Sequence, residues 1–227
     1  MMTAPLEFHI APSRSSGEVP AILECPEGAR SLLVLAHGAG AGMRHPFMQS
    51  LARALGARGI AALRYQFPYM EKGSRRPDPQ PLLVATVRAA VAAARERAPD
   101  LALFAGGKSM GGRMSSLAAA SAGALEGVRG LVFFGFPLHR AREPGIRRAE
   151  HLGGVTVPML FLQGTRDALA SIDLITDVVA RLGPRAALHV VEGADHSFTV
   201  LKSARRDAGA VMDELADTVS SWTGHLI

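Results

Sequence analysis

Short apolar runs alternate with longer amphipathic segments along this sequence, and this alternation is the feature that most constrains its fold. The apolar runs cover residues 31–36, 60–65, 101–106, 130–134, 159–164 and 187–191. Continuous apolar runs of this length are typical of strands that are buried on both faces of a sheet. We therefore expect a mainly parallel sheet built from right-handed crossovers.

The segments between these runs have helical patterns, at residues 46–58, 81–97, 110–122, 171–182 and 205–222. Residues 19–24 and 6–10 are suited to leading antiparallel edge strands. This order of elements predicts an α/β fold with a doubly wound, mainly parallel sheet, in one domain over residues 1–227. The polar segment 137–157 has room for one short helix and little else, so we expect minimal or no lid over the site.

Composition excludes several other classes. Hydrophobic residues make up 48% of the 227 positions, which is enough for a substantial core, and no run approaches the length of a membrane span. We expect no signal peptide, because the N-terminal segment carries Glu7 and several prolines and has no long apolar run. We expect a cytoplasmic protein, because a single cysteine, Cys25, cannot form an internal disulfide. The high alanine and arginine content is typical of bacteria with GC-rich genomes. The net charge of +5 comes mostly from scattered arginines, so we expect no nucleic-acid partner.

The segment 104–113, FAGGKSMGGR, is compatible at first with two kinds of site. A phosphate-binding loop would need a glycine five positions before Gly107, but Ala102 stands there, inside the expected strand. The alternative is a G-x-S-x-G turn, in which a serine lies between a strand and a helix. Gly107 and Gly111 leave the space that such a strained turn requires. The spacing therefore favours Ser109 as a nucleophile.

A serine hydroxyl needs a base to take its proton and a carboxylate to orient that base. Asp167 follows the run at 159–164, and His196 follows the run at 187–191. Parallel sheets place their sites at the carboxyl ends of strands, so Ser109, Asp167 and His196 form a candidate triad in the order serine, acid, histidine. Asp167 as a helix cap and His196 as a structural loop residue remain alternatives. Asp195 and Asp173 compete as the acid.

The segment 36–42, AHGAGAG, follows the first central strand and could supply N–H groups for an oxyanion hole. We expect the amides of Met110 and Ala39 to donate there, with Gly40 as a possible replacement for Ala39. We expect His37 to brace this loop through hydrogen bonds.

Other residues of the sheet-end loops are candidates for substrate contact. The candidates are His37, Met43, His45, Phe67, Tyr69 and Met70. Phe67 and Tyr69 are equally suited to anchoring a core or a loop. Lys108, next to Ser109, either bonds to nearby carbonyl groups or attracts an anionic substrate.

Together these motifs resemble the α/β-hydrolase superfamily over the whole chain. They look most like a small dienelactone-hydrolase-like subgroup related to testis-expressed and chromatin-complex hydrolase-like proteins. The segments that carry the resemblance are HGAGAGMRHPFM (37–48), RYQFPYMEKGSRRPDP (64–79), GGKSMGGRM (106–114), LQGTRD (162–167) and GADHSF (193–198).

The resemblance implies a triad of Ser109, Asp167 and His196. Dienelactone hydrolases proper have cysteine as the nucleophile, so their substrate is not transferred to this chain. We expect a serine hydrolase that acts on a small ester-like substrate through an acyl-enzyme, with no metal and no organic cofactor. A non-catalytic scaffold on the same fold, and a thioester, amide or peptide hydrolase on the same triad, remain alternatives. The sequence does not fix the oligomeric state.

Overall fold

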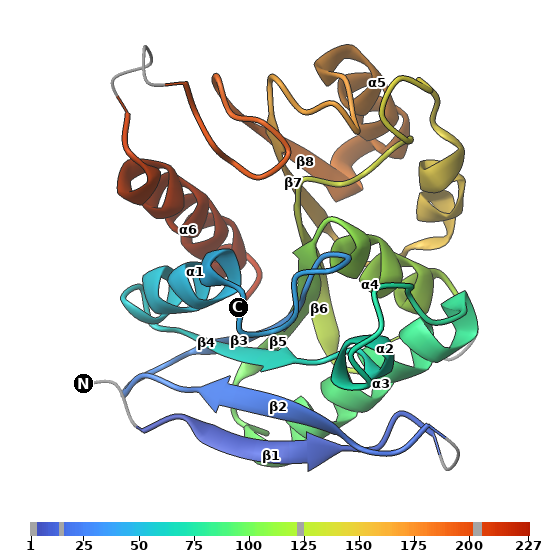
Figure 1. Ribbon diagram of the computed structural model, residues 1–227. Coiled ribbons are helices and arrows are strands. Elements are labelled where there is room, and N and C mark those ends of the chain that lie inside the picture. The colour runs from blue at the N-terminus through green and yellow to red at the C-terminus, as the bar shows by residue number, and fades with distance from the viewer. Residues whose placement is uncertain (1–3, 14–15, 122–124, 202–205) are drawn as a thin grey trace.

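The computed structural model describes residues 4–13, 16–121, 125–201 and 206–227. Its centre is an eight-stranded sheet with the order β1-β2-β4-β3-β5-β6-β7-β8 (Figure 1). The strands are β1 Leu6–Ile10, β2 Val19–Glu24, β3 Ser31–Ala36, β4 Ile60–Tyr65, β5 Ala102–Lys108, β6 Val128–Phe134, β7 Met159–Gly164 and β8 Ala186–Val191. The pairs β1–β2 and β2–β4 are antiparallel, and the pairs from β4 to β8 are parallel. The predicted doubly wound, mainly parallel sheet is confirmed.

Helices cover both faces of the sheet (Figure 1). They are α1 Pro46–Gly56, α2 Pro68–Glu71, α3 Gln80–Arg97, α4 Met110–Ala120, α5 Ile172–Leu182 and α6 Ala208–Gly224, with short 3-10 helices η1 Arg147–Gly154 and η2 Gly183–Arg185. Helices α1 and α6 pack on one face, and their buried side chains form one core cluster. Helices α3, α4 and α5 contribute to the cluster on the other face.

The alternation of side chains along β3 shows why the central strands are apolar throughout. Leu32 and Val34 belong to one core cluster, whereas Leu33 and Leu35 belong to the other. Successive side chains of a strand point to opposite faces of the sheet. When helices cover both faces, every position is buried, so polar residues do not alternate with apolar ones.

Several boundaries differ from the sequence prediction. Strand β5 runs on to Lys108, two residues beyond the predicted end, because its last residue still pairs with Phe134 of β6. Helix α2 was not predicted, since it is only four residues long. The segment 137–157 holds the short helix η1, as expected. One helix was predicted to end at residue 122 and another to begin at residue 205, and both of these positions lie outside the described residues.

Candidate active site

Ser109 lies at the turn between β5 and α4, with φ 50° and ψ −116°. A positive φ is unusual for a residue that carries a Cβ, so this turn is strained. The two glycines around it make the turn sterically possible. A Cβ at Gly107 would lie 2.2 Å from the carbonyl oxygen of Ala36, and a Cβ at Gly111 would lie 2.4 Å from the same atom. The G-x-S-x-G spacing therefore reflects contact with β3, the neighbouring strand.

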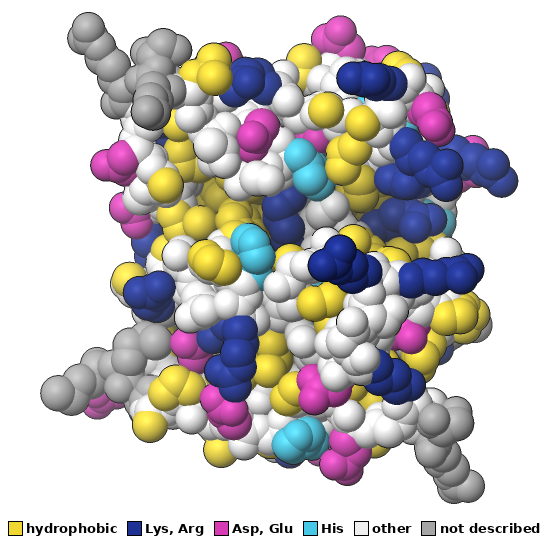
Figure 2. Space-filling model, viewed as in Figure 1, with side chains coloured by type: hydrophobic (Ala, Val, Ile, Leu, Met, Phe, Trp, Pro, Cys, Tyr) yellow, Lys and Arg dark blue, Asp and Glu magenta, His cyan; other side chains and the backbone are white. Residues whose placement is uncertain are grey.

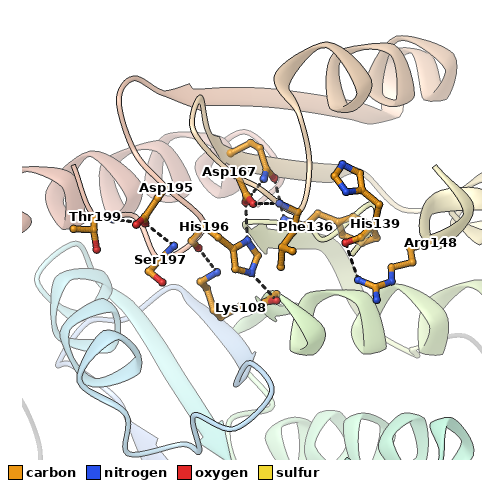
Figure 3. A network of polar contacts seen from close by, with 12 residues as sticks. Lys108, Phe136, His139, Arg148, Asp167, Asp195, His196, Ser197 and Thr199 are labelled. Carbon is orange, nitrogen blue, oxygen red and sulfur yellow. Dashed lines mark hydrogen bonds and ion pairs between the residues drawn. The ribbon is translucent and has the colours of Figure 1, made fainter. Parts of the chain in front are cut away.

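The three residues of the candidate triad are brought together (Figure 3). His196 Nε2 lies 2.8 Å from Ser109 Oγ, and His196 Nδ1 lies 2.7 Å from Asp167 Oδ2. Asp167 is buried, with 5% of its surface exposed. This geometry fixes the histidine tautomer: Nδ1–H donates to the carboxylate, and Nε2 faces the serine hydroxyl as an acceptor.

Asp167 is held by two further hydrogen bonds. Its Oδ1 accepts from the backbone N–H of Leu169 at 2.8 Å within a turn. The helix-cap alternative for Asp167 is wrong, because α5 begins at Ile172 with Ser171 at its N-cap. Asp167 Oδ2 also accepts from Nε2 of Gln163 at 2.5 Å. The other end of the Gln163 amide accepts from the N–H of Phe136 at 2.9 Å. Gln163 was missed, because nothing in an apolar run marks its one polar residue as a support for the site.

The two other candidate acids, Asp195 and Asp173, have different positions and contacts from Asp167. Asp195 Oδ1 accepts from the backbone N–H groups of Ser197 and Thr199, at 2.8 and 2.9 Å, and so braces the loop that carries His196. Asp173 lies in the first turn of α5. Of the three candidate acids, Asp167 is the one bonded to the imidazole.

Lys108 is buried with 9% of its surface exposed, and its Nζ donates to the backbone carbonyl of His196 at 2.5 Å (Figure 3). Burial lowers the pKa of Lys108 to about 8, against the raising effect of the nearby carboxylates of Asp167 and Asp195. A Cβ at Gly135 would lie 3.0 Å from this Nζ, so the ammonium group is closely packed. This hydrogen bond agrees with the first of the two alternatives for Lys108, in which it bonds to nearby carbonyl groups. The Lys108 side chain also lines the cleft.

The glycine-rich loop after β3 is braced by His37, as expected. The His37 Nδ1–H donates to the carbonyl of Gly38 at 2.8 Å, and Nε2 accepts from the N–H of Phe67 at 3.1 Å. Burial lowers the pKa of His37 to about 4, so its ring is neutral near neutral pH. His37 is fully buried and does not contact the cleft, which corrects its assignment to substrate binding.

Tyr69 changes the candidate oxyanion hole. The N–H of Gly40 donates to Tyr69 Oη at 3.1 Å, so this amide is already used. Gly40 therefore does not replace Ala39 as a donor, which corrects that part of the expectation. Ala39 itself lines the cleft. Met110 is the first residue of α4, where N–H groups have no acceptor within the helix.

Three more residues expected at the cleft lie in the core instead. Met43, Phe67 and Tyr69 are each at most 3% exposed and do not line the space around Ser109. Phe67 packs its ring edge-on against His37 and Tyr65. Large aromatic side chains gain more from full burial than from a place at an open cleft, and the sequence does not distinguish the two.

The cleft has a volume of about 430 Å³. Its lining residues are Gly38, Ala39, Gly40, Ala41, His45, Phe47, Met48, Lys108, Ser109, Leu169, His196 and Ser197. His45 was among the expected residues, and its Nδ1 caps the start of α1 by accepting from the N–H of Phe47 at 3.2 Å. Phe47, Met48 and Leu169 were missed, because their place in the sequence pattern is that of ordinary core or loop residues.

A second serine–histidine pair joins α4 to η1. Ser116 Oγ is 2.7 Å from His151 Nε2, but Ser116 is fully buried and its hydroxyl donates to the carbonyl of Arg113 at 2.8 Å. Since the hydroxyl proton is directed at Arg113, the pair is arranged with His151 as the donor. Burial lowers the pKa of His151 to about 4. This pair is suited to holding η1 against α4, not to nucleophilic attack.

Among the described residues, no group of three or more His, Cys, Asp or Glu side chains is arranged to hold a metal ion. No helix in the described part of the chain has the length and apolar character needed to cross a membrane.

Solved structures with the same fold include several hydrolases. Dienelactone hydrolase from Anabaena variabilis is 23% identical, with a TM-score of 0.77 over 98% of this chain and 99% of that one. An α/β serine hydrolase without lid from Xanthomonas campestris is 21% identical, with a TM-score of 0.75 over 97% and 95%. A serine hydrolase homologue from Coxiella burnetii is 19% identical, with a TM-score of 0.72 over 95% and 96%.

The family model described as an alpha/beta hydrolase domain matches residues 29–224. This range runs from the start of β3 to the end of α6 and contains all the residues of the cleft. The chain therefore belongs to the alpha/beta hydrolase family.

Proposed function

We propose that this protein is a serine hydrolase, similar to carboxylesterases, that cleaves small ester-like substrates through an acyl-enzyme. The observation that carries the proposal is the chain of contacts from Ser109 Oγ to His196 Nε2 at 2.8 Å and from His196 Nδ1 to Asp167 Oδ2 at 2.7 Å. A serine, a base and an orienting carboxylate at these distances form the arrangement that activates a hydroxyl group.

In the first half of the reaction, His196 takes the proton from Ser109, and Oγ attacks the ester carbonyl. The N–H groups of Met110 and Ala39 stabilise the negative charge on the carbonyl oxygen. His196 then gives its proton to the departing alcohol, which leaves an acyl-enzyme on Ser109. Asp167, buried beside the imidazole, stabilises its protonated form.

In the second half, His196 takes a proton from water, and the resulting nucleophile attacks the acyl-enzyme. The tetrahedral intermediate collapses, and the proton returns to Ser109 as the acid product leaves. The proton of Ser109 leaves with the alcohol, and a proton from water replaces it. The proposed substrate is a small molecule. We also propose a cytoplasmic location, because the sequence has one cysteine, Cys25, and so cannot form an internal disulfide.

The test is labelling of the purified protein with a fluorophosphonate, followed by peptide mass spectrometry. We expect one adduct on Ser109, no adduct in Ser109→Ala and strongly reduced labelling in His196→Ala. Ser116→Ala is the matched control, because it removes the other serine that lies beside a histidine, and it should label like the wild type.

A folded protein that gives no adduct would overturn the proposal and favour a non-catalytic scaffold. If Ser109 is labelled, short esters, thioesters and amides compared at equal concentration identify the bond that is cleaved. Turnover of thioesters or amides without turnover of esters would replace the ester assignment while keeping the triad.

A further inference from the structure

A second hollow, which we call the α1–α6 groove, lies beside the cleft around Ser109. It has a volume of about 680 Å³, and its walls come from α1, from the start of α6 and from the loop after β8. Phe47 and Ser197 line both spaces, so the groove borders the cleft. Figure 2 shows apolar side chains gathered in a hollow near the middle of this face.

The floor of the groove is apolar. The rings of Phe47 and Phe198 are stacked, with centroids 5.9 Å apart and an angle of 14° between their planes. Val200, Val211 and Met212 continue this lining. Arg53, Arg206 and Asp213 also line the groove. An apolar floor beside a reaction cleft is suited to an apolar part of the substrate, since each buried methylene is worth about 0.8 kcal/mol.

The position of His196 indicates which part of the ester lies there. In the proposed reaction the leaving alcohol takes its proton from His196, so the alcohol lies on the His196 side of the scissile bond. The groove wall begins with Ser197 and Phe198, the two residues that directly follow His196. Of the candidate oxyanion donors, Ala39 lies in the loop after β3 and Met110 is the first residue of α4, and neither lines the groove.

We propose that the α1–α6 groove binds the alcohol part of the substrate, and that the substrate class is a short-acyl ester of an extended, apolar alcohol. This inference rests on the proposed ester hydrolysis. It assigns the large apolar group to one side of the ester only, and the acyl group remains in the smaller cleft around Ser109.

Two homologous series of esters test the proposal. The first contains acetates of linear alcohols from ethyl to octyl, and the second contains p-nitrophenyl esters of acyl chains from acetyl to octanoyl. We expect kcat/KM to rise by up to about fourfold for each methylene added to the alcohol, until the groove is filled. We expect no comparable rise along the acyl series.

Ser50→Trp fills the groove from α1, where Ser50 is a half-buried groove residue. We expect it to lower kcat/KM for octyl acetate by about tenfold or more and to leave ethyl acetate within about twofold. The matched control is Gln49→Trp, which places the same ring on the exposed neighbouring position, outside the groove. It should leave both series unchanged.

The outcomes separate the two proposals. Labelling of Ser109 and turnover of ethyl acetate, with no effect of Ser50→Trp on either series, would overturn the groove assignment alone. An effect of Ser50→Trp on the acyl series alone would show that the groove holds the acyl group and would also overturn it. Absence of both labelling and ester turnover would overturn the proposed function together with this inference.

Discussion

The ammonium group of Lys108 donates a 2.5 Å hydrogen bond to the backbone carbonyl of His196. This bond joins the residue before the candidate nucleophile directly to the residue that carries the candidate base. The bond connects the end of β5 to the loop that carries His196, 88 positions later in the sequence. We therefore propose that Lys108 acts through His196 as a positioning residue.

Lys108→Met should lower kcat for a short ester by about tenfold, an effect on the order of one lost charge-assisted hydrogen bond. KM for a neutral ester should change little, because the bond orients His196 and not the substrate. Measuring the same kinetic constants with an anionic ester distinguishes a positioning role of Lys108 from direct attraction of the substrate. A variant that lost activity only toward the anionic ester would contradict the positioning role.

The same substitution should alter the pH dependence of stability. Burial lowers the pKa of Lys108 from 10.5 to about 8, so between these values the unfolded chain binds the proton and the folded chain releases it. The free energy of unfolding of the wild type should therefore rise relative to Lys108→Met as pH increases through this window, by up to about 1.4 kcal/mol per pH unit. Urea denaturation at several pH values measures the difference; a constant difference would contradict it.

Gln163→Leu should reduce both activity and stability. The buried Gln163 amide links Asp167 Oδ2 to the N–H of Phe136, so the substitution leaves a backbone donor unpaired and frees the carboxylate to turn. We expect a loss of about 1–3 kcal/mol in the free energy of unfolding and a fall in kcat. Denaturation and ester kinetics measure the two effects, and Gln163→Leu with unchanged kcat would show that Asp167 needs no such support.

Tyr69→Phe and Tyr65→Phe form a matched pair. Tyr69 Oη accepts from Gly40, whereas Tyr65 Oη is buried with no hydrogen-bond partner among the described residues. Tyr69→Phe should lower kcat, because the loop that carries Ala39 loses its support. Tyr65→Phe should leave kcat unchanged and stabilise the fold by about 1 kcal/mol, since it removes an unsatisfied polar group. Equal effects of the two substitutions on kcat would contradict this explanation.

Gly111→Ala should destabilise the protein by about 3 kcal/mol or more, because its Cβ would lie 2.4 Å from the carbonyl oxygen of Ala36. Gly145→Ala is the control, since a Cβ there meets no atom within 4 Å. Thermal denaturation of both variants measures the difference. A stable, fully active Gly111→Ala protein would show that α4 tolerates a shift away from β3.

The sequence predicted the sheet well because its central strands are buried on both faces. Residues 31–36, 60–65 and 159–164 are predicted strands whose bounds agree with β3, β4 and β7. The end of β5 was placed too early, because Gly107 and Lys108 do not carry the apolar pattern that marked the other strand ends. Pairing with β6 extends the strand there, and a long-range pairing has no local signal.

The candidate site also has a part that the sequence predicted well and a part that it did not. The proximity of Ser109, Asp167 and His196 could be predicted because all three follow the carboxyl ends of strands, which this topology brings to one edge of the sheet. The side chains around them were predicted less well. Phe67 and Tyr69 were candidates for the cleft and are core residues, whereas Phe47 resembled a core residue and lines the cleft. The direction of a loop side chain depends on contacts across the fold, which spacing does not encode.

The pairing of α1 with α6 on one face of the sheet has a consequence for protein engineering. The residues that line the α1–α6 groove belong to these two helices and to the loop after β8. Ser109 and Asp167, by contrast, follow the ends of strands β5 and β7. If the groove binds the alcohol group as proposed, substitutions at positions 50 and 212 should change substrate selectivity and leave the reacting atoms in place. New preferences should evolve here by exchanging helix surface residues, without rebuilding the chemistry.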